Sequence, residues 1–183
     1  MTSTLVLGGV RSGKSRHAEA LLRREPHVRY VATAQQADES DPTWATRVAD
    51  HRARRPDAWE TVETIDVAGA IRSATSPVLI DCLGIWLART IDGLEGWEDP
   101  DATSLLLRES VADLRSAWVA APVDVVAVTN EVGLGVVPPS ASGRLFRDEL
   151  GRLNTALSAA SDRVHLVVAG RVLDLSHAPR VDE

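Results

Sequence analysis

Residues 8–15, Gly8-Gly9-Val10-Arg11-Ser12-Gly13-Lys14-Ser15, decide the fold of this chain. They match the phosphate-binding pattern G-x-x-x-x-G-K-[ST] at every fixed position. The apolar run Leu5–Leu7 before them is typical of a short buried strand, and residues 16–22 after them are typical of a helix. Strand, glycine-rich loop and helix in this order form the P-loop of nucleotide-binding proteins. We therefore expect a nucleotide at the carboxyl end of the first strand.

Each residue type in this loop has a physical role. The glycines let the backbone curl, so that its N–H groups point inward at phosphate oxygens. The N-terminus of the following helix adds a partial positive charge. Lys14 is predicted to reach the β- and γ-phosphates, and Ser15 is predicted to offer its hydroxyl to Mg²⁺.

Composition narrows the class of protein. A chain of 183 residues predicts one domain, 1–183, and its 44% hydrophobic and 25% charged residues are typical of a soluble globular protein. The net charge of -6 argues against a general nucleic-acid binder. The single cysteine, Cys82, excludes an internal disulfide framework, and no apolar stretch approaches the ~20 residues of a membrane span. With no signal peptide before the first strand, the sequence predicts a cytoplasmic enzyme.

Apolar strand-like runs alternate with helical patterns along the chain. Strands are expected at 5–7, 28–33, 59–64, 77–82, 123–129 and 164–169. Helices are expected at 16–22, 43–55, 67–73, 83–91, 104–120 and 144–160, with loops at 35–43 and 130–142 and a mobile, acidic loop at 92–101. Repeated strand-then-helix units with near-continuous apolar strands predict an α/β fold: a mainly parallel sheet with helices on both faces.

Asp81 ends the apolar run Val78–Ile80. Open parallel sheets bind their ligands at the carboxyl ends of the strands, so Asp81 is expected at the same edge as the P-loop. A carboxylate there suits the Mg²⁺ of a bound nucleotide, and we favour this interpretation over a solvated loop acid. Thr129–Gly133 leaves a later strand at the same edge, where its polar groups fit either substrate contact or ordinary loop chemistry.

A basic helix carries His51. On the expected helix, Arg47, His51 and Arg55 are spaced i, i+4 and i+8, with Arg54 close to the same face. These cations would favour the neutral, nucleophilic imidazole and would bind phosphates. A histidine in this setting can attack phosphorus to form a covalent intermediate. A solvated basic helix face explains the same pattern without chemistry, and because runs of charge usually are solvated faces, the spacing alone favours that interpretation.

The sequence resembles a known enzyme family over most of its length. The matching stretches, in order, are GGVRSGKSRHAE, YVATAQ, RVADHRARRPDAWETVE, VLIDCLGIWL, VTNEVGLGVVP, GRLFRDELGRLN and DRVHLVVAG. The family is the bifunctional adenosylcobinamide kinase / adenosylcobinamide-phosphate guanylyltransferase of cobalamin biosynthesis. The resemblance implies a RecA-like P-loop NTPase fold and a homo-oligomer, since trimers are known in the family.

The resemblance also implies two reactions. ATP or GTP would phosphorylate adenosylcobinamide, and GTP would then give adenosylcobinamide-GDP and pyrophosphate through a guanylylated histidine, which corresponds to His51. The nucleotide contacts it implies are Gly8 to Ser15, Ala32, Thr33, Ala34, Arg52, Ala53, Arg54, Arg55, Glu63 and Asp81. Together these assignments make His51 and Lys14 the candidate catalytic residues, and Ser15 and Asp81 the candidate Mg²⁺ ligands.

Three positions depart from the family pattern. Pro42-Thr43-Trp44 replaces an acidic stretch, Thr155 stands where glutamine is common, and Asp81 stands where some members have glutamate. Two alternative functions also fit the P-loop: a monofunctional small-molecule kinase that needs no nucleophilic His51, and a regulatory protein that uses nucleotide as a switch.

Overall fold

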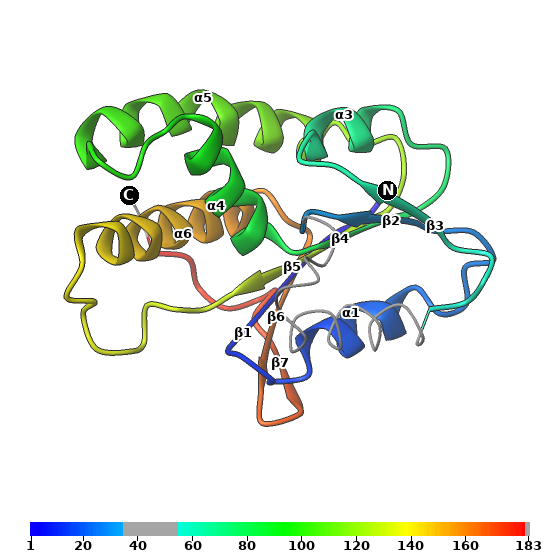
Figure 1. Cartoon of the computed structure of the whole chain (residues 1–183). Helices are drawn as coiled ribbons and strands as arrows, with labels where there is room; N and C mark the ends of the chain where they lie inside the picture. The colour runs from blue at the N-terminus through cyan, green and yellow to red at the C-terminus, as the bar shows by residue number, and fades with distance from the viewer. Residues whose placement is uncertain (35–54, 182–183) are drawn as a thin grey trace.

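The computed structural model describes residues 1–34 and 55–181. Seven described strands form one sheet in the order β3-β2-β4-β5-β1-β6-β7 (Figure 1). Their bounds are β1 (Ser3–Gly8), β2 (Arg29–Ala32), β3 (Glu60–Glu63), β4 (Val78–Asp81), β5 (Val125–Asn130), β6 (Arg163–Val168) and β7 (Arg171–Asp174). All neighbouring strands pair parallel except β6 and β7, which form an antiparallel hairpin. The predicted mainly parallel α/β sheet is confirmed.

Helices cover both faces of the sheet. Their bounds are α1 (Lys14–Leu21), α3 (Val67–Arg72), α4 (Leu83–Gly93), α5 (Pro100–Val119) and α6 (Ala141–Ala159). In Figure 1, α3, α4, α5 and α6 lie on one side of the sheet and α1 lies on the other. The larger core cluster lies between α3 to α6 and the sheet and includes Val31 and Ile80. The smaller cluster lies between α1 and the sheet and includes Tyr30 and Leu79. Because side chains alternate along a strand, consecutive residues enter opposite cores.

Several element boundaries differ from the sequence-based prediction. Helix α5 begins at Pro100 rather than at 104, because Asp99 caps it by accepting from the N–H of Ala102 at 3.1 Å. The expected loop at 92–101 is therefore shorter. Within the remaining linker, the Trp97 indole donates to the carboxylate of Asp92, near the end of α4, at 2.6 Å.

Strand β7 was not expected. Its four residues are all exposed, so they lack the buried positions on which strand prediction depends. The helix predicted at 43–55 lies outside the described residues except for its last position. None of the described helices has the length and apolar character needed to cross a membrane.

Candidate nucleotide site

The loop between β1 and α1 has the backbone of a phosphate-binding loop. Gly13 has φ 99° and Arg11 has φ 56°, and these left-handed conformations turn the chain into the helix. Gly8 packs so closely that a Cβ there would lie 2.5 Å from Oγ of Ser12 and 2.6 Å from the carbonyl oxygen of Val167. Only glycine fits at that position without moving the loop.

The lysine of the motif lies against the same loop. Nζ of Lys14 donates to the carbonyl oxygen of Gly9 at 3.2 Å, while the first helical hydrogen bond runs from the His17 N–H to the Gly13 carbonyl at 2.9 Å. Oγ of Ser12, which is buried, lies 3.4 Å from the N–H of Lys14. The Lys14 ammonium group and the first N–H groups of α1 therefore lie close together, as phosphate binding requires.

The β6–β7 hairpin supports the loop from the other side. The N–H of Gly170, in the hairpin turn, donates to the carbonyl oxygen of Ser12 at 2.9 Å. Val167, on β6, supplies the carbonyl that Gly8 approaches. This contact spans more than 150 positions of sequence, so only the parallel pairing of β1 with β6 brings it about.

The strands place the predicted site residues along one edge. Gly8 pairs with Asn130, so β1 and β5 end together. Ala32 pairs with both Glu63 and Asp81, so β3, β2 and β4 also end in one row. The expectation that Asp81 shares the carboxyl edge of the sheet with the P-loop is thus confirmed. The assignment of these residues as nucleotide contacts stays a prediction.

Asp81 is held by a tyrosine that the sequence analysis did not single out. The hydroxyl of Tyr30 donates to Oδ2 of Asp81 at 2.8 Å. Burial of the ring, followed by the nearby Asp81 charge, raises the pKa of Tyr30 far above its usual value, so the phenol stays protonated and remains a donor. No sequence pattern marks this pair, because its members lie 51 positions apart.

Arg55 lies over the ring of the same tyrosine. Its guanidinium carbon is 3.5 Å from the centroid of the Tyr30 ring, a cation–π contact, and its Nη1 donates to Oγ1 of Thr61 at 2.9 Å. Thr61 pairs with Tyr30 across β2 and β3, so all three side chains share one face. The guanidinium predicted to bind phosphate is thereby fixed beside Tyr30.

Thr33 forms hydrogen bonds with Cys82, the residue after Asp81. Its hydroxyl donates to the carbonyl oxygen of Cys82 at 2.8 Å and accepts from the Cys82 N–H at 3.0 Å, and its side chain is fully buried. Its own carbonyl accepts from Arg89 at 2.8 Å. The polar groups of Thr33 therefore fix the end of β4. Burial raises the pKa of the Cys82 thiol to about 11, which keeps it protonated and unreactive.

The polar residues at the end of β5 bond within the protein. Oγ1 of Thr129 donates to Asn154 at 2.7 Å, and the Asn154 amide donates to the carbonyl oxygen of Asn130 at 3.0 Å. The Glu131 carboxylate accepts from the Gly133 N–H at 2.6 Å. These bonds favour the structural interpretation of 129–133. Asn154, a buried polar residue among the leucines of α6, was missed because its partner lies on another element.

Two histidines next to the P-loop form a pair. Nε2 of His17 lies 3.0 Å from Nδ1 of His165, with the rings 5.1 Å apart. Burial and then the charge of His165 lower the pKa of His17. The pair joins α1 to β6, which is a structural role for both side chains.

The residues predicted to hold Mg²⁺ fit that ion. Ser15 offers a hydroxyl and Asp81 a carboxylate, and Mg²⁺ prefers oxygen ligands. Helix α1 packs against β4, and the Lys14 charge acts on the thiol of Cys82, so the start of α1 lies near the end of β4. Residues 1–34 and 55–181 contain no cluster of three or more His, Cys, Asp or Glu side chains that could hold a metal alone.

Four predicted site residues, His51, Arg52, Ala53 and Arg54, lie outside the described residues. Ala34 is described and is half-buried just beyond β2. Glu63 ends β3 with its side chain exposed.

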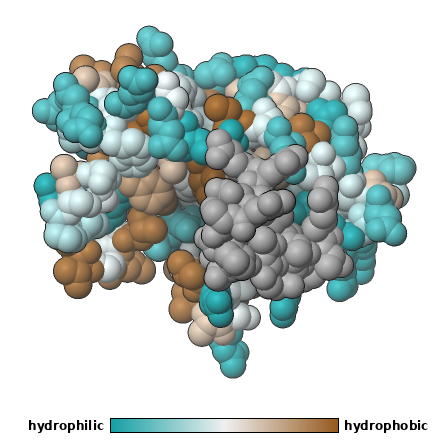
Figure 2. Space-filling model, viewed as in Figure 1, coloured by the Kyte–Doolittle hydropathy of each residue, from teal (hydrophilic) through white to brown (hydrophobic). Residues whose placement is uncertain are grey.

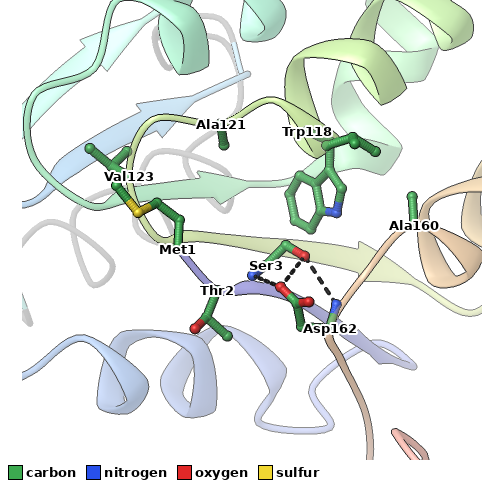
Figure 3. Close-up of a pocket in the computed structure, with 9 residues that line it drawn as sticks. Met1, Thr2, Ser3, Trp118, Ala121, Val123, Ala160 and Asp162 are labelled. Carbon is green, nitrogen blue, oxygen red and sulfur yellow. Dashed lines mark hydrogen bonds between the residues drawn. The ribbon is translucent and has the colours of Figure 1, made fainter.

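A pocket of about 200 Å³ lies at the opposite edge of the sheet (Figure 3). It is lined by the start of β1 and the ends of α5 and α6, and includes Ser3, Trp118 and Asp162. Oδ2 of Asp162 accepts from the Ser3 N–H at 2.7 Å and from the Ser3 hydroxyl at 3.0 Å. These bonds lower the pKa of Asp162 and join β6 to β1. The P-loop follows the other end of β1, so this pocket is separate from the nucleotide site.

Comparisons with known proteins agree with this geometry. The model of the family described as cobinamide kinase / cobinamide phosphate guanyltransferase matches residues 4–175. The chain belongs to this family. The bifunctional adenosylcobalamin biosynthesis protein CobU of Escherichia coli (strain K12) is 40% identical over 175 residues, which cover 91% of this chain and 95% of that protein. Protein CobP of Pseudomonas aeruginosa, with the same description, is 38% identical over 96% and 98% of the two chains.

Membership of the cobinamide kinase / guanyltransferase family settles the class of enzyme. The bifunctional relatives favour the two-reaction prediction over a monofunctional kinase or a regulatory switch. Among solved structures, an ATPase of a bacterial type III secretion system superposes with a TM-score of 0.56 at 12% identity. That match covers 90% of this chain and 50% of the ATPase. It shows that the fold is that of the P-loop NTPases.

Proposed function

We propose that this protein, as one unit comprising residues 1–183, phosphorylates adenosylcobinamide with ATP or GTP and then guanylylates the product. The observation that carries the proposal is the placement of a complete P-loop and Asp81 at one sheet edge, in a chain that belongs to the cobinamide kinase / guanyltransferase family. The substrates are a corrinoid alcohol, its phosphate, and the two nucleotides.

The kinase step needs positioning and charge neutralisation at the γ-phosphate. The loop from Gly8 to Ser15 would hold the phosphates through its N–H groups, and Lys14 would move from the Gly9 carbonyl to phosphate oxygens. Ser15 and Asp81 would hold Mg²⁺, which when bound neutralises charge on the β- and γ-phosphates. The substrate oxygen would then form a bond to the γ-phosphorus and lose its proton to solvent, while the bond from that phosphorus to the bridging oxygen breaks and the nucleoside diphosphate leaves.

The guanylyl step needs attack at the α-phosphorus instead. In our proposal, a nitrogen of neutral His51 forms a bond to that phosphorus, and the bond to the bridging oxygen breaks to release pyrophosphate. A phosphate oxygen of adenosylcobinamide phosphate then attacks the same phosphorus and releases the imidazole. Arg52, Arg54 and Arg55 would bind phosphates during these steps. Arg55 is the described residue nearest to His51 in sequence, and its guanidinium lies over the ring of Tyr30, whose hydroxyl donates to Asp81.

We also propose a homo-oligomer, a trimer by analogy with the family. Three exposed apolar side chains, Leu134, Val136 and Val137, support an interface on the loop between β5 and α6. Figure 2 shows brown surface at the lower left, where Figure 1 places this loop in yellow.

Product analysis tests the function directly. The purified protein is incubated with adenosylcobinamide and Mg²⁺, first with ATP and then with ATP plus GTP, and the corrinoids are separated and weighed by mass spectrometry. We expect the corrinoid phosphate with ATP alone and the GDP derivative once GTP is added. A reaction that stops at the phosphate would favour the monofunctional kinase, and unchanged adenosylcobinamide would refute both reactions.

A further inference from the structure

Tyr30 is placed by the core, and only its hydroxyl reaches the carboxyl edge. The residue is 2% exposed, and its ring packs in the smaller core cluster with Ala18 of α1 and Leu79 of β4. Arg55 covers one face of the ring at 3.5 Å. With the ring packed on these sides, the hydroxyl lies 2.8 Å from Oδ2 of Asp81.

The strand register explains why the hydroxyl points at this carboxylate. Tyr30 pairs with Leu79, and Asp81 lies two residues further along β4. Residues two apart on a strand share a face, so the Asp81 side chain lies on the α1 side, the side from which Ser15 and Lys14 approach. A tyrosine is long enough to reach from its own register position to the residue two further along.

We propose that Tyr30 is a positioning residue for the metal site: its hydroxyl fixes the orientation of the Asp81 carboxylate toward the P-loop. Arg55 stacks on the Tyr30 ring and donates to Oγ1 of Thr61. The inference rests on the proposed role of Asp81 as a ligand of Mg²⁺. Partners that orient a metal ligand typically contribute 10–100-fold to metal affinity.

The test is Tyr30→Phe, which removes the hydroxyl and keeps the ring, its packing and the cation–π contact. Mn²⁺ serves as a spectroscopic probe for the Mg²⁺ site, and electron paramagnetic resonance gives its dissociation constant from the GTP complex. We expect this constant to rise about tenfold or more in Tyr30→Phe. GTP affinity in EDTA is expected to stay at the wild-type value, because the P-loop is unaltered; that measurement also shows that the variant is folded.

Two further variants separate the possible outcomes. Thr61→Val removes the Arg55 hydrogen bond on the same face and is expected to leave Mn²⁺ affinity unchanged. Asp81→Asn is expected to abolish most Mn²⁺ binding. Wild-type Mn²⁺ affinity in Tyr30→Phe, with binding lost in Asp81→Asn, would overturn the role of Tyr30 and leave that of Asp81 standing. Wild-type affinity in Asp81→Asn would overturn the proposed metal role of Asp81. A loss of Mn²⁺ affinity in Thr61→Val as large as that in Tyr30→Phe would assign the effect to general loosening of the site and would also refute the inference.

Discussion

Replacing Gly8 by alanine tests whether the P-loop is packed as tightly as the structure describes. The added Cβ would lie 2.5 Å from Oγ of Ser12 and 2.6 Å from the carbonyl oxygen of Val167. Both distances are far below van der Waals contact, and the second atom belongs to the backbone of β6, which is paired on both sides. Relief therefore requires that the loop move away from β6. Overpacking of this kind typically costs about 1–3 kcal/mol.

Gly9→Ala is the matched control. Gly9 is the next residue in the same loop, and a Cβ there would meet nothing within 4 Å. Both substitutions restrict the unfolded chain equally, so this effect cancels when the two variants are compared. The free energy of unfolding of Gly8→Ala should lie about 1–3 kcal/mol below that of Gly9→Ala. For a chain of this size the difference corresponds to roughly 2–12 °C in Tm.

Thermal unfolding followed by circular dichroism measures the difference, and titration with a fluorescent GTP analogue measures its effect on the site. We expect weaker GTP binding in Gly8→Ala, because the N–H groups of the displaced loop no longer point at the phosphates. Equal Tm values for the two variants, with wild-type GTP affinity in Gly8→Ala, would refute the close packing of the P-loop against β6.

Two other predictions concern residues that support the site. Thr33→Val removes the partner of the buried Cys82 N–H, and we expect it to lower the free energy of unfolding by about 1–3 kcal/mol, measured by urea denaturation. Thr33→Ser, which keeps the hydroxyl, should lose less, and equal losses would contradict the hydrogen-bond argument. The pKa of His17 is lowered in the folded protein, so as pH falls the unfolded chain protonates His17 before the folded protein does. Neutral His17 therefore contributes fully to the free energy of unfolding above pH 6.5, and this contribution declines below that pH. Denaturation between pH 7 and pH 5 should therefore show a shallower decline of stability in His17→Gln, and an unchanged slope would contradict the lowered pKa of His17.

The sequence predicted those parts of the site that are local. The P-loop pattern, the apolar strand before it and the acid at the end of β4 each occupy a few consecutive residues. Parallel strands then bring their carboxyl ends to one edge, so the proximity of Asp81 to the P-loop followed from general rules. The same local patterns gave the type of most described helices and strands.

Contacts across the sheet were not predictable. The bond from Tyr30 to Asp81 depends on the register of β2 with β4, and the His17–His165 pair depends on how α1 packs near β6. Neither register nor packing leaves a signal in one sequence. The β6–β7 hairpin was missed for a different reason, since its second strand is short and exposed. These long-range contacts hold the P-loop and Asp81 in place. The local sequence patterns identify those residues but carry no sign of the contacts.

In the proposed mechanism, His51 carries the guanylyl group between GTP and the corrinoid phosphate. The protein is incubated with Mg²⁺ and GTP labelled at the α-phosphate, then denatured and tested for bound label. We predict an adduct that is labile in acid and stable in alkali, as a phosphoramidate is, and that is absent from His51→Ala. A folded, GTP-binding wild-type protein that takes up no label, or a His51→Ala variant that is labelled equally, would contradict the covalent mechanism.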